Sequence, residues 1–330
     1  MAITKASLAS MVSRRSVPTI LSIFLTAVIF YMVVYTRPSA RHQRSEEAAA
    51  LREELYEQLE SSHTKVQELE NRVMAFDQKV WSDCSLPDFG AFFDSVIGKI
   101  ACYSSGDIVC ESIRISGQWD ADVEKALKPY MTSETTFVDV GSNIGWYTFL
   151  MARTNPVVAY EPFLKNLQLQ TATRCANGNL AQRIELHGYG LSDQTIHCDL
   201  YQIPTVNIGD THSACDDETR KKLLKDGYQK LGESVVHRLD DVASERLMQA
   251  EKVMKIDIEG HEYEMLLGAK KFLTSHNPPK AIYMEMFLLD ARIGGKTKKQ
   301  LAIEFLAQCQ YKLATIDRNA PNYLFVMNRM

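Results

Sequence analysis

Short apolar runs alternate with helical patterns along most of the chain after residue 115. Runs typical of buried or half-buried strands occupy residues 136–140, 157–160, 183–189, 252–256, 281–286, 311–316 and 323–327. Helical spacing of apolar residues marks segments 120–131, 163–175 and 263–273 and a segment that ends at residue 152. Strands that alternate with helices predict an α/β fold with a seven-stranded, mostly parallel sheet and helices on both faces.

The N-terminal part has a different pattern. Residues 17–35 are uncharged and largely apolar, with Arg14 and Arg15 before them and Arg37 after them. At about 1.5 Å per residue this run matches a hydrocarbon core of roughly 30 Å. A cleaved signal peptide has a shorter apolar core and a small-residue cleavage site. The pattern therefore predicts a short tail over 1–16 and a retained single-pass membrane anchor over 17–35.

The orientation of this anchor is not decided by Lys and Arg counts. Each flank carries three basic residues: Lys5, Arg14 and Arg15 before the anchor, and Arg37, Arg41 and Arg44 after it. A short tail ahead of an anchor favours a type II protein, with its bulk in the lumen of the Golgi or secretory pathway. The first 45 residues contain no acidic residue, so a mitochondrial membrane is the alternative.

Residues 36–82 form a predicted helical stem. A heptad frame places Leu59, Val66, Val73 and Val80 at a, and Leu55, Leu69 and Phe76 at d. Arg52 and Ser62 interrupt the frame. We expect either a helical stem that pairs two chains into a homodimer, or a single charged helix or loose spacer. Residues 83–330 form the globular domain, with an irregular linker over 83–116 and the core over 115–330.

Charge and cysteine content narrow the partners. The net charge of −4 and the absence of a basic run argue against a nucleic-acid partner. The seven cysteines have no zinc-type spacing. They fit small buried apolar residues, or a disulfide among Cys84, Cys102 and Cys110 if the domain lies in an oxidising compartment.

A glycine-containing turn follows the strand at 136–140. Its residues Asp139, Gly141, Asn143 and Gly145 read D-x-G-x-N-x-G, whereas a dinucleotide loop reads G-x-G-x-x-G. The glycines provide a positive φ or a close approach of the backbone, or they pack the helix. Asp139 supports the turn or contacts a ligand, and Asn143 caps the next helix or presents its amide to the ligand.

Polar residues also follow other strands. Gly141, Glu161, Asp193, Asp257 and Glu285 lie at or near five strand ends. Because ligands bind at the carboxyl ends of parallel strands, we expect these residues to converge on one site. Glu161 suits a ribose diol or acts as a helix N-terminal charge. Asp193 accepts from an adenine amino group or caps a turn.

A group of acidic residues and a histidine follows the strand at 252–256. Asp257, Glu259 and His261 lie within five residues there and are the candidate catalytic residues. Asp257 or His261 is a candidate general base for a hydroxyl, although a lone histidine is often structural. Alternatively, Asp257 and Glu285 hold a divalent cation. The polar segment 201–235 is predicted as an acceptor-binding cap or as a solvated helical insertion over 217–230.

The order of these motifs resembles that of the FkbM-type methyltransferases, which use S-adenosylmethionine (SAM). The matching blocks are 137–149, 190–193, 238–242 and 254–262, with a weaker match at 207–209. Ser142, where the family often has Ala, and His261 depart from the pattern. The resemblance covers residues 115–330 and implies a class I, Rossmann-like methyltransferase fold that O-methylates hydroxyls of sugars or natural products.

The same resemblance implies which residues contact SAM. The expected set is Asp139, Gly141, Asn143, Gly145, Glu161, Ser192 and Asp193. Together with the anchor and stem, it predicts a membrane-anchored O-methyltransferase acting on a hydroxyl of a glycan or glycoconjugate. The alternatives are a methyltransferase for a lipid or small metabolite at a membrane surface, and a non-catalytic scaffold that keeps the fold.

Overall fold

The computed structural model describes residues 83–203, 207–209, 211–286, 289–316 and 322–328. The chain divides into two compact units, Met1–Val73 and Met74–Met330, and every described residue belongs to the second. The predicted tail, anchor and stem over residues 1–82 lie outside the described residues. Within the described part of the chain, no helix has the length and apolar character needed to cross a membrane.

A seven-stranded sheet forms the centre of the domain, in the order β14-β15-β11-β10-β3-β4-β5. Its strands are β3 Thr136–Val140, β4 Val157–Tyr160, β5 Ile184–His187, β10 Lys252–Ile256, β11 Ala281–Glu285, β14 Tyr311–Ile316 and β15 Asn322–Met327. Neighbouring strands from β5 to β11 are parallel, and only β15 runs against its two neighbours. The predicted seven-stranded, mostly parallel sheet is thus confirmed.

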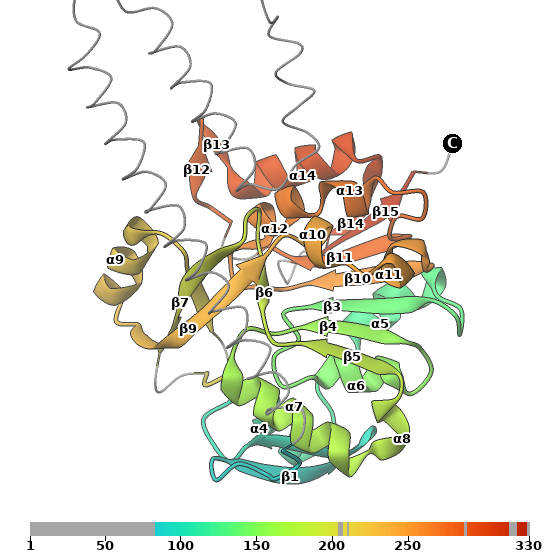
Figure 1. Cartoon of the computed structure of the whole chain (residues 1–330), viewed down its shortest axis with the longest axis vertical. Helices are drawn as coiled ribbons and strands as arrows, with labels where there is room; N and C mark the ends of the chain where they lie inside the picture. The colour runs from blue at the N-terminus through green and yellow to red at the C-terminus, as the bar shows by residue number, and fades with distance from the viewer. Residues whose placement is uncertain (1–82, 204–206, 210, 287–288, 317–321, 329–330) are drawn as a thin grey trace, which may run out of the picture. The chain divides into compact units, whose positions relative to one another are not determined.

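Helices cover both faces of this sheet because successive strand residues point to opposite sides. In β3, Phe137 packs into one core and Val138 into the other. Helices α5 Asp122–Leu127, α6 Trp146–Ala152 and α7 Leu164–Ala176 contribute to the first core. Helices α12 Glu262–Gly268, α13 Lys270–Leu273 and α14 Lys298–Gln308 contribute to the second (Figure 1). The short connecting elements are η2 Lys128–Tyr130, α8 Gly178–Ala181, α10 Leu239–Val242, α11 Glu245–Gln249, β12 Arg292–Ile293 and β13 Lys296–Thr297.

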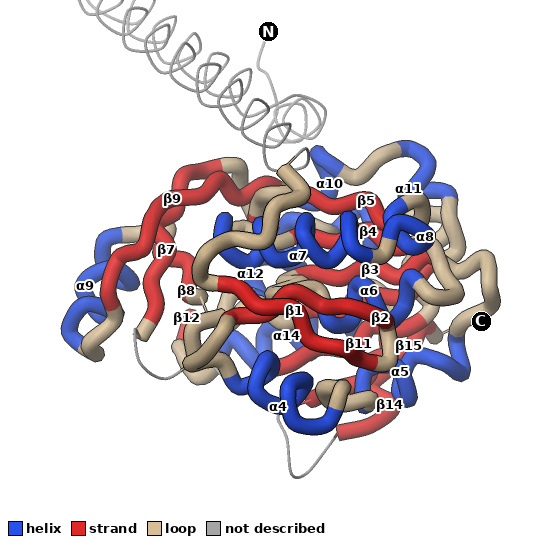
Figure 2. Tube along the Cα trace, turned by 90° about the horizontal axis from the view of Figure 1, so that it is seen from below, coloured by secondary structure: helices blue, strands red, loops and turns tan. Residues whose placement is uncertain are grey.

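The segment before the core is regular, and our prediction of an irregular linker over 83–116 was wrong. It forms a hairpin of β1 Gly90–Ser95 and β2 Gly98–Tyr103, followed by helix α4 Ile108–Ser116. Strand β2 packs on α7, where Ala101 N–H donates to Thr173 Oγ1 at 2.9 Å (Figure 2). Burial does not alternate along β2, because its first two residues are exposed and its last four are buried.

The segment between β5 and β10 contains a second, four-stranded sheet in the order β6-β9-β7-β8. Its elements are β6 Gly190–Leu191, β7 Ile196–Gln202, β8 His212–Ala214 and β9 Gln229–His237, with helix α9 Asp217–Lys225 between β8 and β9. The predicted helical insertion over 217–230 is therefore helical only to Lys225. Gly227 adopts φ +90°, which favours glycine and ends the helical path before β9 begins.

Two disulfides stabilise the domain. Cys84 pairs with Cys175 of α7, and Cys198 of β7 pairs with Cys215 at the start of α9. The predicted disulfide within the group Cys84, Cys102 and Cys110 was wrong, because Cys102 and Cys110 are buried free thiols. The partner of Cys84 lies 91 residues away along the chain, and only the tertiary fold brings the two together.

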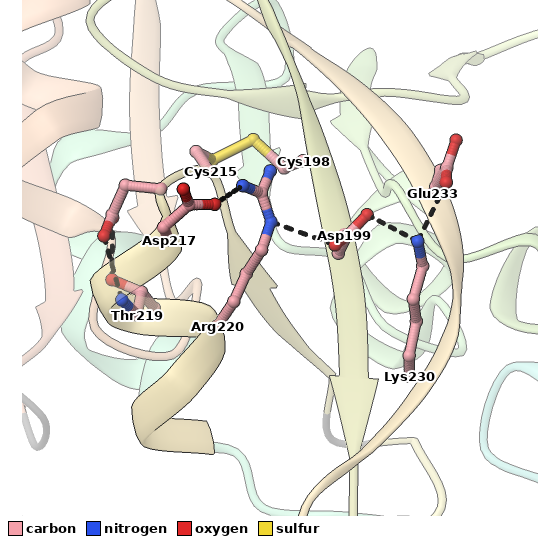
Figure 3. Close-up of polar contacts among 9 residues, drawn as sticks. Cys198, Asp199, Cys215, Asp217, Thr219, Arg220, Lys230 and Glu233 are labelled. Atoms are coloured by element: carbon pink, nitrogen blue, oxygen red, sulfur yellow. Dashed lines mark hydrogen bonds and ion pairs between the residues drawn. A yellow bond between two sulfur atoms is a disulfide. The ribbon is translucent and has the colours of Figure 1, made fainter. Parts of the chain in front are cut away.

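Ion pairs reinforce the second disulfide. Arg220 of α9 donates through Nε to Asp199 of β7 at 2.9 Å, and Lys230 Nζ of β9 lies 2.8 Å from the same carboxylate (Figure 3). The hydrogen bond from Lys230 holds the pKa of Asp199 below its usual value. Together with the Cys198–Cys215 disulfide, these contacts attach α9 to the second sheet.

Candidate active site at the carboxyl edge of the sheet

The turn after β3 has a backbone that only particular residues adopt. Gly141 has φ +79°, and a Cβ there would lie 1.8 Å from the carbonyl oxygen of Asp257. Gly145 has φ +89° and precedes α6 as its N-cap, with no side-chain capping bond. The suggestion that Asn143 caps this helix was therefore wrong. Asn143 adopts φ +51° instead, and its Oδ1 is buried without a hydrogen-bond partner among the described residues.

Glu161 joins this turn to the end of β4. Its Oε2 accepts from Asn143 N–H at 2.7 Å, and its Oε1 accepts from Phe163 N–H at 2.9 Å and from Asn166 Nδ2 at 3.3 Å. The residue is 4% exposed, and burial raises the pKa of its carboxyl to about 7. Oε1 accepts two hydrogen bonds and Oε2 accepts one, so Oε2 is the oxygen with a lone pair still available.

A buried lysine lies beneath the turn. Lys255 Nζ donates to the Gly141 carbonyl at 2.6 Å and lies 3.2 Å from Asp257 Oδ2 and 3.6 Å from Asp139 Oδ1. Burial lowers the pKa of Lys255, but the carboxylates of Asp257 and Asp139 outweigh burial and raise it. We did not select Lys255 from the sequence, although a lysine inside an apolar strand signals a paired charge.

Asp139 supports the turn from below. It is fully buried, and Oδ2 accepts from Thr148 Oγ1 at 2.6 Å. Burial raises the pKa of Asp139 despite the nearby Lys255. Neither Asp139 nor Gly145 lines the cleft described below. Of the two roles expected for Asp139, support of the turn is the one that its contacts favour.

The acidic residues after β10 and β11 lie side by side. Ile256 pairs with Met284 in parallel register, so the following residues Asp257 and Glu285 end neighbouring strands. Burial, together with the charge of Asp257, raises the pKa of Glu285 to about 8. Among the described residues no group of three or more His, Cys, Asp or Glu side chains is arranged to hold a metal ion. The ammonium group of Lys255 already places a positive charge beside Asp257.

His261 contacts the loop that follows β6. Its Nε2 lies 2.9 Å from Ser192 Oγ, and this hydroxyl donates to Asp193 Oδ1 at 3.2 Å. Burial lowers the pKa of His261. The expectation that Asp193 ends a strand of the central sheet was wrong: β5 ends at His187, and Asp193 follows β6 of the second sheet. Ser192 and Asp193 do not line the cleft described below. Ser192 contacts His261, which does line it, and Asp193 accepts from Ser192.

Glu262 is a second functional residue that sequence reasoning missed. Its Oε1 accepts from Ile258 N–H and Gly260 N–H, both at 3.1 Å, and thereby fixes the loop that carries Glu259. Glu262 is 2% exposed, and burial raises the pKa of its carboxyl to about 7. Glu259 itself adopts φ +54°. The loop geometry that Glu262 stabilises cannot be read from the residue spacing alone.

A cleft of about 630 Å³, its open mouth included, lies between these elements. Its wall brings together residues from the ends of β3, β4 and β10 and from the second sheet. It is lined by Val140, Gly141, Asn143, Tyr160, Glu161, Pro162, Gly190, Leu191, Gly209, Thr211, Ser213, Val236, Asp257, Ile258, Glu259 and His261. Six of the predicted cofactor-binding and catalytic residues therefore line this cleft: Gly141, Asn143, Glu161, Asp257, Glu259 and His261.

The sheet order and the position of this cleft define a methyltransferase-like α/β fold. Residues 139–313, more than half of the chain, match the model of the methyltransferase FkbM domain. The chain belongs to the FkbM methyltransferase family. The family implies SAM as methyl donor.

Similar proteins include a tRNA U34 carboxymethyltransferase of Campylobacter jejuni, which is 24% identical over 183 residues. The match covers 52% of this chain and 60% of that protein, so the chain spans about three fifths of this relative's length. Among solved structures, methyltransferase FkbM from Methylobacillus flagellatus has 22% identity and a TM-score of 0.38, covering 59% of this chain and 44% of that one. Monomeric WbdD has 12% identity and a TM-score of 0.35, covering 64% and 42%.

Proposed function

We propose that this chain is a SAM-dependent O-methyltransferase that acts on a hydroxyl of a glycan or glycoconjugate. The observation that carries the proposal is His261, whose imidazole lines the cleft with its Nε2 2.9 Å from the hydroxyl of Ser192. An alcohol has a high pKa, so a base beside the methyl donor is the group that O-methylation requires.

The cleft wall suits the donor. Oε2 of Glu161 has a spare lone pair for a ribose hydroxyl, and the carboxylate sits at a second strand end as such a contact requires. Oδ1 of Asn143 and Oγ1 of Thr211 are buried cleft atoms without hydrogen-bond partners among the described residues, as expected where a ligand supplies them. Bound SAM supplies a methyl group on a positively charged sulfur.

The chain's own part in the reaction is to position a hydroxyl and to remove its proton. Ser192 has one hydroxyl proton and donates it to Asp193, so its oxygen accepts from Nε2–H of His261. The lone pair of His261 then lies on Nδ1, and burial keeps the pKa of this ring low and the ring uncharged. We assign His261 as the base, and Asp257 and Glu259 as acceptors of hydrogen bonds from the substrate.

Two disulfides support a luminal location. Cys84–Cys175 and Cys198–Cys215 persist in oxidising compartments and are rare in the cytosol. The predicted type II anchor over residues 17–35 and the stem agree with this location in the Golgi or secretory pathway. Glycans with free hydroxyls are the abundant acceptors there, which favours them over a lipid or small metabolite.

A labelling experiment tests the proposal. The full-length chain is incubated with methyl-labelled SAM and, separately, with glycans, membrane lipids and tRNA as acceptors. We expect label in an alkali-stable ether on the glycan. His261→Asn should lower kcat by about 10²- to 10⁴-fold with donor affinity unchanged, whereas the exposed control His276→Asn should have no effect. Label only in lipid or only in tRNA would contradict the proposed acceptor.

A further inference from the structure

Asp107, which precedes α4, has one carboxylate bound to two distant parts of the chain. Oδ1 accepts from Cys110 N–H at 2.8 Å and caps α4, while Oδ2 accepts from Gly209 N–H at 2.9 Å. Asp107 is 3% exposed. Residues 107 and 209 are far apart in sequence, so this carboxylate is a direct connection between the N-terminal segment and the cleft wall.

Further contacts hold the segment 207–209 against the start of α4. Ile208 N–H donates to the Gly106 carbonyl at 3.0 Å, and Ile108 N–H donates to Asn207 Oδ1 at 3.4 Å. A Cβ at Gly106 would lie 2.7 Å from Ile208 Cδ1, which shows how closely the two segments pack. Several contacts therefore hold Gly209 in place. One of them is its hydrogen bond to the buried carboxylate of Asp107.

Gly209 in turn contacts the proposed donor site. Its carbonyl accepts from Asn166 Nδ2 at 3.3 Å, and the same amide donates to Glu161 Oε1 at 3.3 Å. Tyr103 O–H donates to Asn166 Oδ1 at 2.7 Å and so fixes the orientation of this amide. A Cβ at Gly209 would lie 2.7 Å from Asn143 Oδ1, so Gly209 packs closely against the Asn143 side chain.

We propose that Asp107 is a positioning residue for the methyl-donor cleft. It holds Gly209 against Asn143 and Asn166, and Asn166 holds Glu161. Asp107 lies outside residues 139–313, which match the family model, so part of the support for this cleft comes from the segment that precedes the match. This inference rests on the proposed function, because it assumes that the cleft binds SAM.

The variant Asp107→Asn tests the hydrogen-bonding role of Asp107 without a change in side-chain volume. The amide has the same size, but its NH₂ group faces one of the two N–H donors and leaves that donor unsatisfied. We expect the Kd for S-adenosylhomocysteine to rise about tenfold. The KM for SAM should rise in parallel, with kcat at saturating SAM within about twofold of wild type. A merely structural role would lower kcat and the fraction of folded protein instead.

Gly209→Ala is the second variant, because its Cβ would lie 2.6 Å from Asp107 Oδ2 and displace the same contact. We expect weakened binding of similar size, and a double variant no weaker than either single one. Gly232→Ala on β9 is the control, since no atom lies within 4 Å of its Cβ position.

Calorimetry with S-adenosylhomocysteine on the full-length chain measures all of these affinities. Wild-type affinity in Asp107→Asn, or single effects that multiply in the double variant, would overturn the positioning role. Circular dichroism checks that each single variant is folded. If either Asp107→Asn or Gly209→Ala is unfolded, the other one is used for the test. If the wild-type chain binds no S-adenosylhomocysteine, the proposed function fails. If wild type and variants bind it equally, only the positioning role of Asp107 fails.

Discussion

The backbone N–H of Asn143 donates to Oε2 of Glu161 at 2.7 Å. This bond connects the turn after β3 to the end of β4, and Asn143 adopts a positive φ to make it. The carboxylate therefore shapes the turn and presents a free lone pair to the cleft. Loss of Glu161 would affect the geometry of Asn143 as well as direct contacts to the donor.

Gly141 should tolerate no side chain. Gly141→Ala places a Cβ 1.8 Å from the Asp257 carbonyl at φ +79°, so strain and overpacking together should cost about 3 kcal/mol or more. Urea unfolding measures the change in the free energy of unfolding. Gly178→Ala, where no atom lies within 4 Å, is the control and should be neutral or slightly stabilising. Equal effects of the two variants would refute the close approach.

Lys255 should contribute more to the stability of the domain than Lys280, a less buried lysine that precedes β11. Lys255→Met leaves Asp139 buried without its cationic neighbour, and removal of one partner from a buried pair costs about 3–5 kcal/mol. Lys280, which precedes β11 and has a side chain that is 23% exposed, pairs with the more exposed Glu251, and Lys280→Met should cost at most about 1 kcal/mol. Thermal and urea unfolding of both variants test this. A Lys255 variant as stable as the Lys280 variant would contradict the buried network.

Glu262 should make the stability of the domain depend on pH. Burial raises the pKa of its carboxyl from 4.5 to about 7, so between these values the folded state binds more protons than the unfolded chain. The free energy of unfolding therefore falls as pH rises through this window. Glu262→Gln keeps an oxygen for both N–H donors and lacks the titration.

Between pH 5 and pH 8 the free energy of unfolding of the wild type should fall by up to about 3 kcal/mol relative to that of Glu262→Gln. Urea unfolding across this range gives the difference at each pH. Glu134→Gln, a substitution at an exposed position, is the surface control in the same series. A wild type that gains stability over Glu262→Gln as pH rises would show that the sign is wrong.

The disulfides should contribute unequally. Cys84–Cys175 closes a loop of 91 residues and Cys198–Cys215 one of 17. On the chain-entropy view, removal of the first pair by Ser substitution should cost roughly 4–5 kcal/mol and removal of the second about 3 kcal/mol. Unfolding of both double-Ser variants tests the order. A larger loss from the shorter loop would count against this account.

The sequence predicted the central sheet well because each strand is short, apolar and bounded by turn residues. Val157–Tyr160, for example, is buried at every position and so has a clear signal. The hairpin and α4 were missed, because β2 has two exposed residues followed by four buried ones, and sequence periodicity does not reveal that it packs on α7. Likewise, Asp193 follows a two-residue strand of a second sheet, which no short-range pattern distinguishes from the end of β5.

Some residues of the site were predicted from the sequence and others were not. Gly141, Asn143, Glu161, Asp257, Glu259 and His261 were predicted from motif spacing, and the structure gathers them on one cleft. Lys255, Glu262 and Asp107 were missed because their roles depend on partners from other elements. Lys255, for instance, acts on the carbonyl of Gly141, 114 residues earlier.

Binding of SAM at the Glu161 side of the cleft is the central claim. Isothermal titration of the full-length chain with SAM tests it most directly, with Glu161→Ala and NAD as comparisons. We expect saturable binding of SAM at one site per chain, loss of this binding in Glu161→Ala, and no binding of NAD. Absence of heat with SAM, binding of NAD instead, or wild-type affinity in Glu161→Ala would contradict the account.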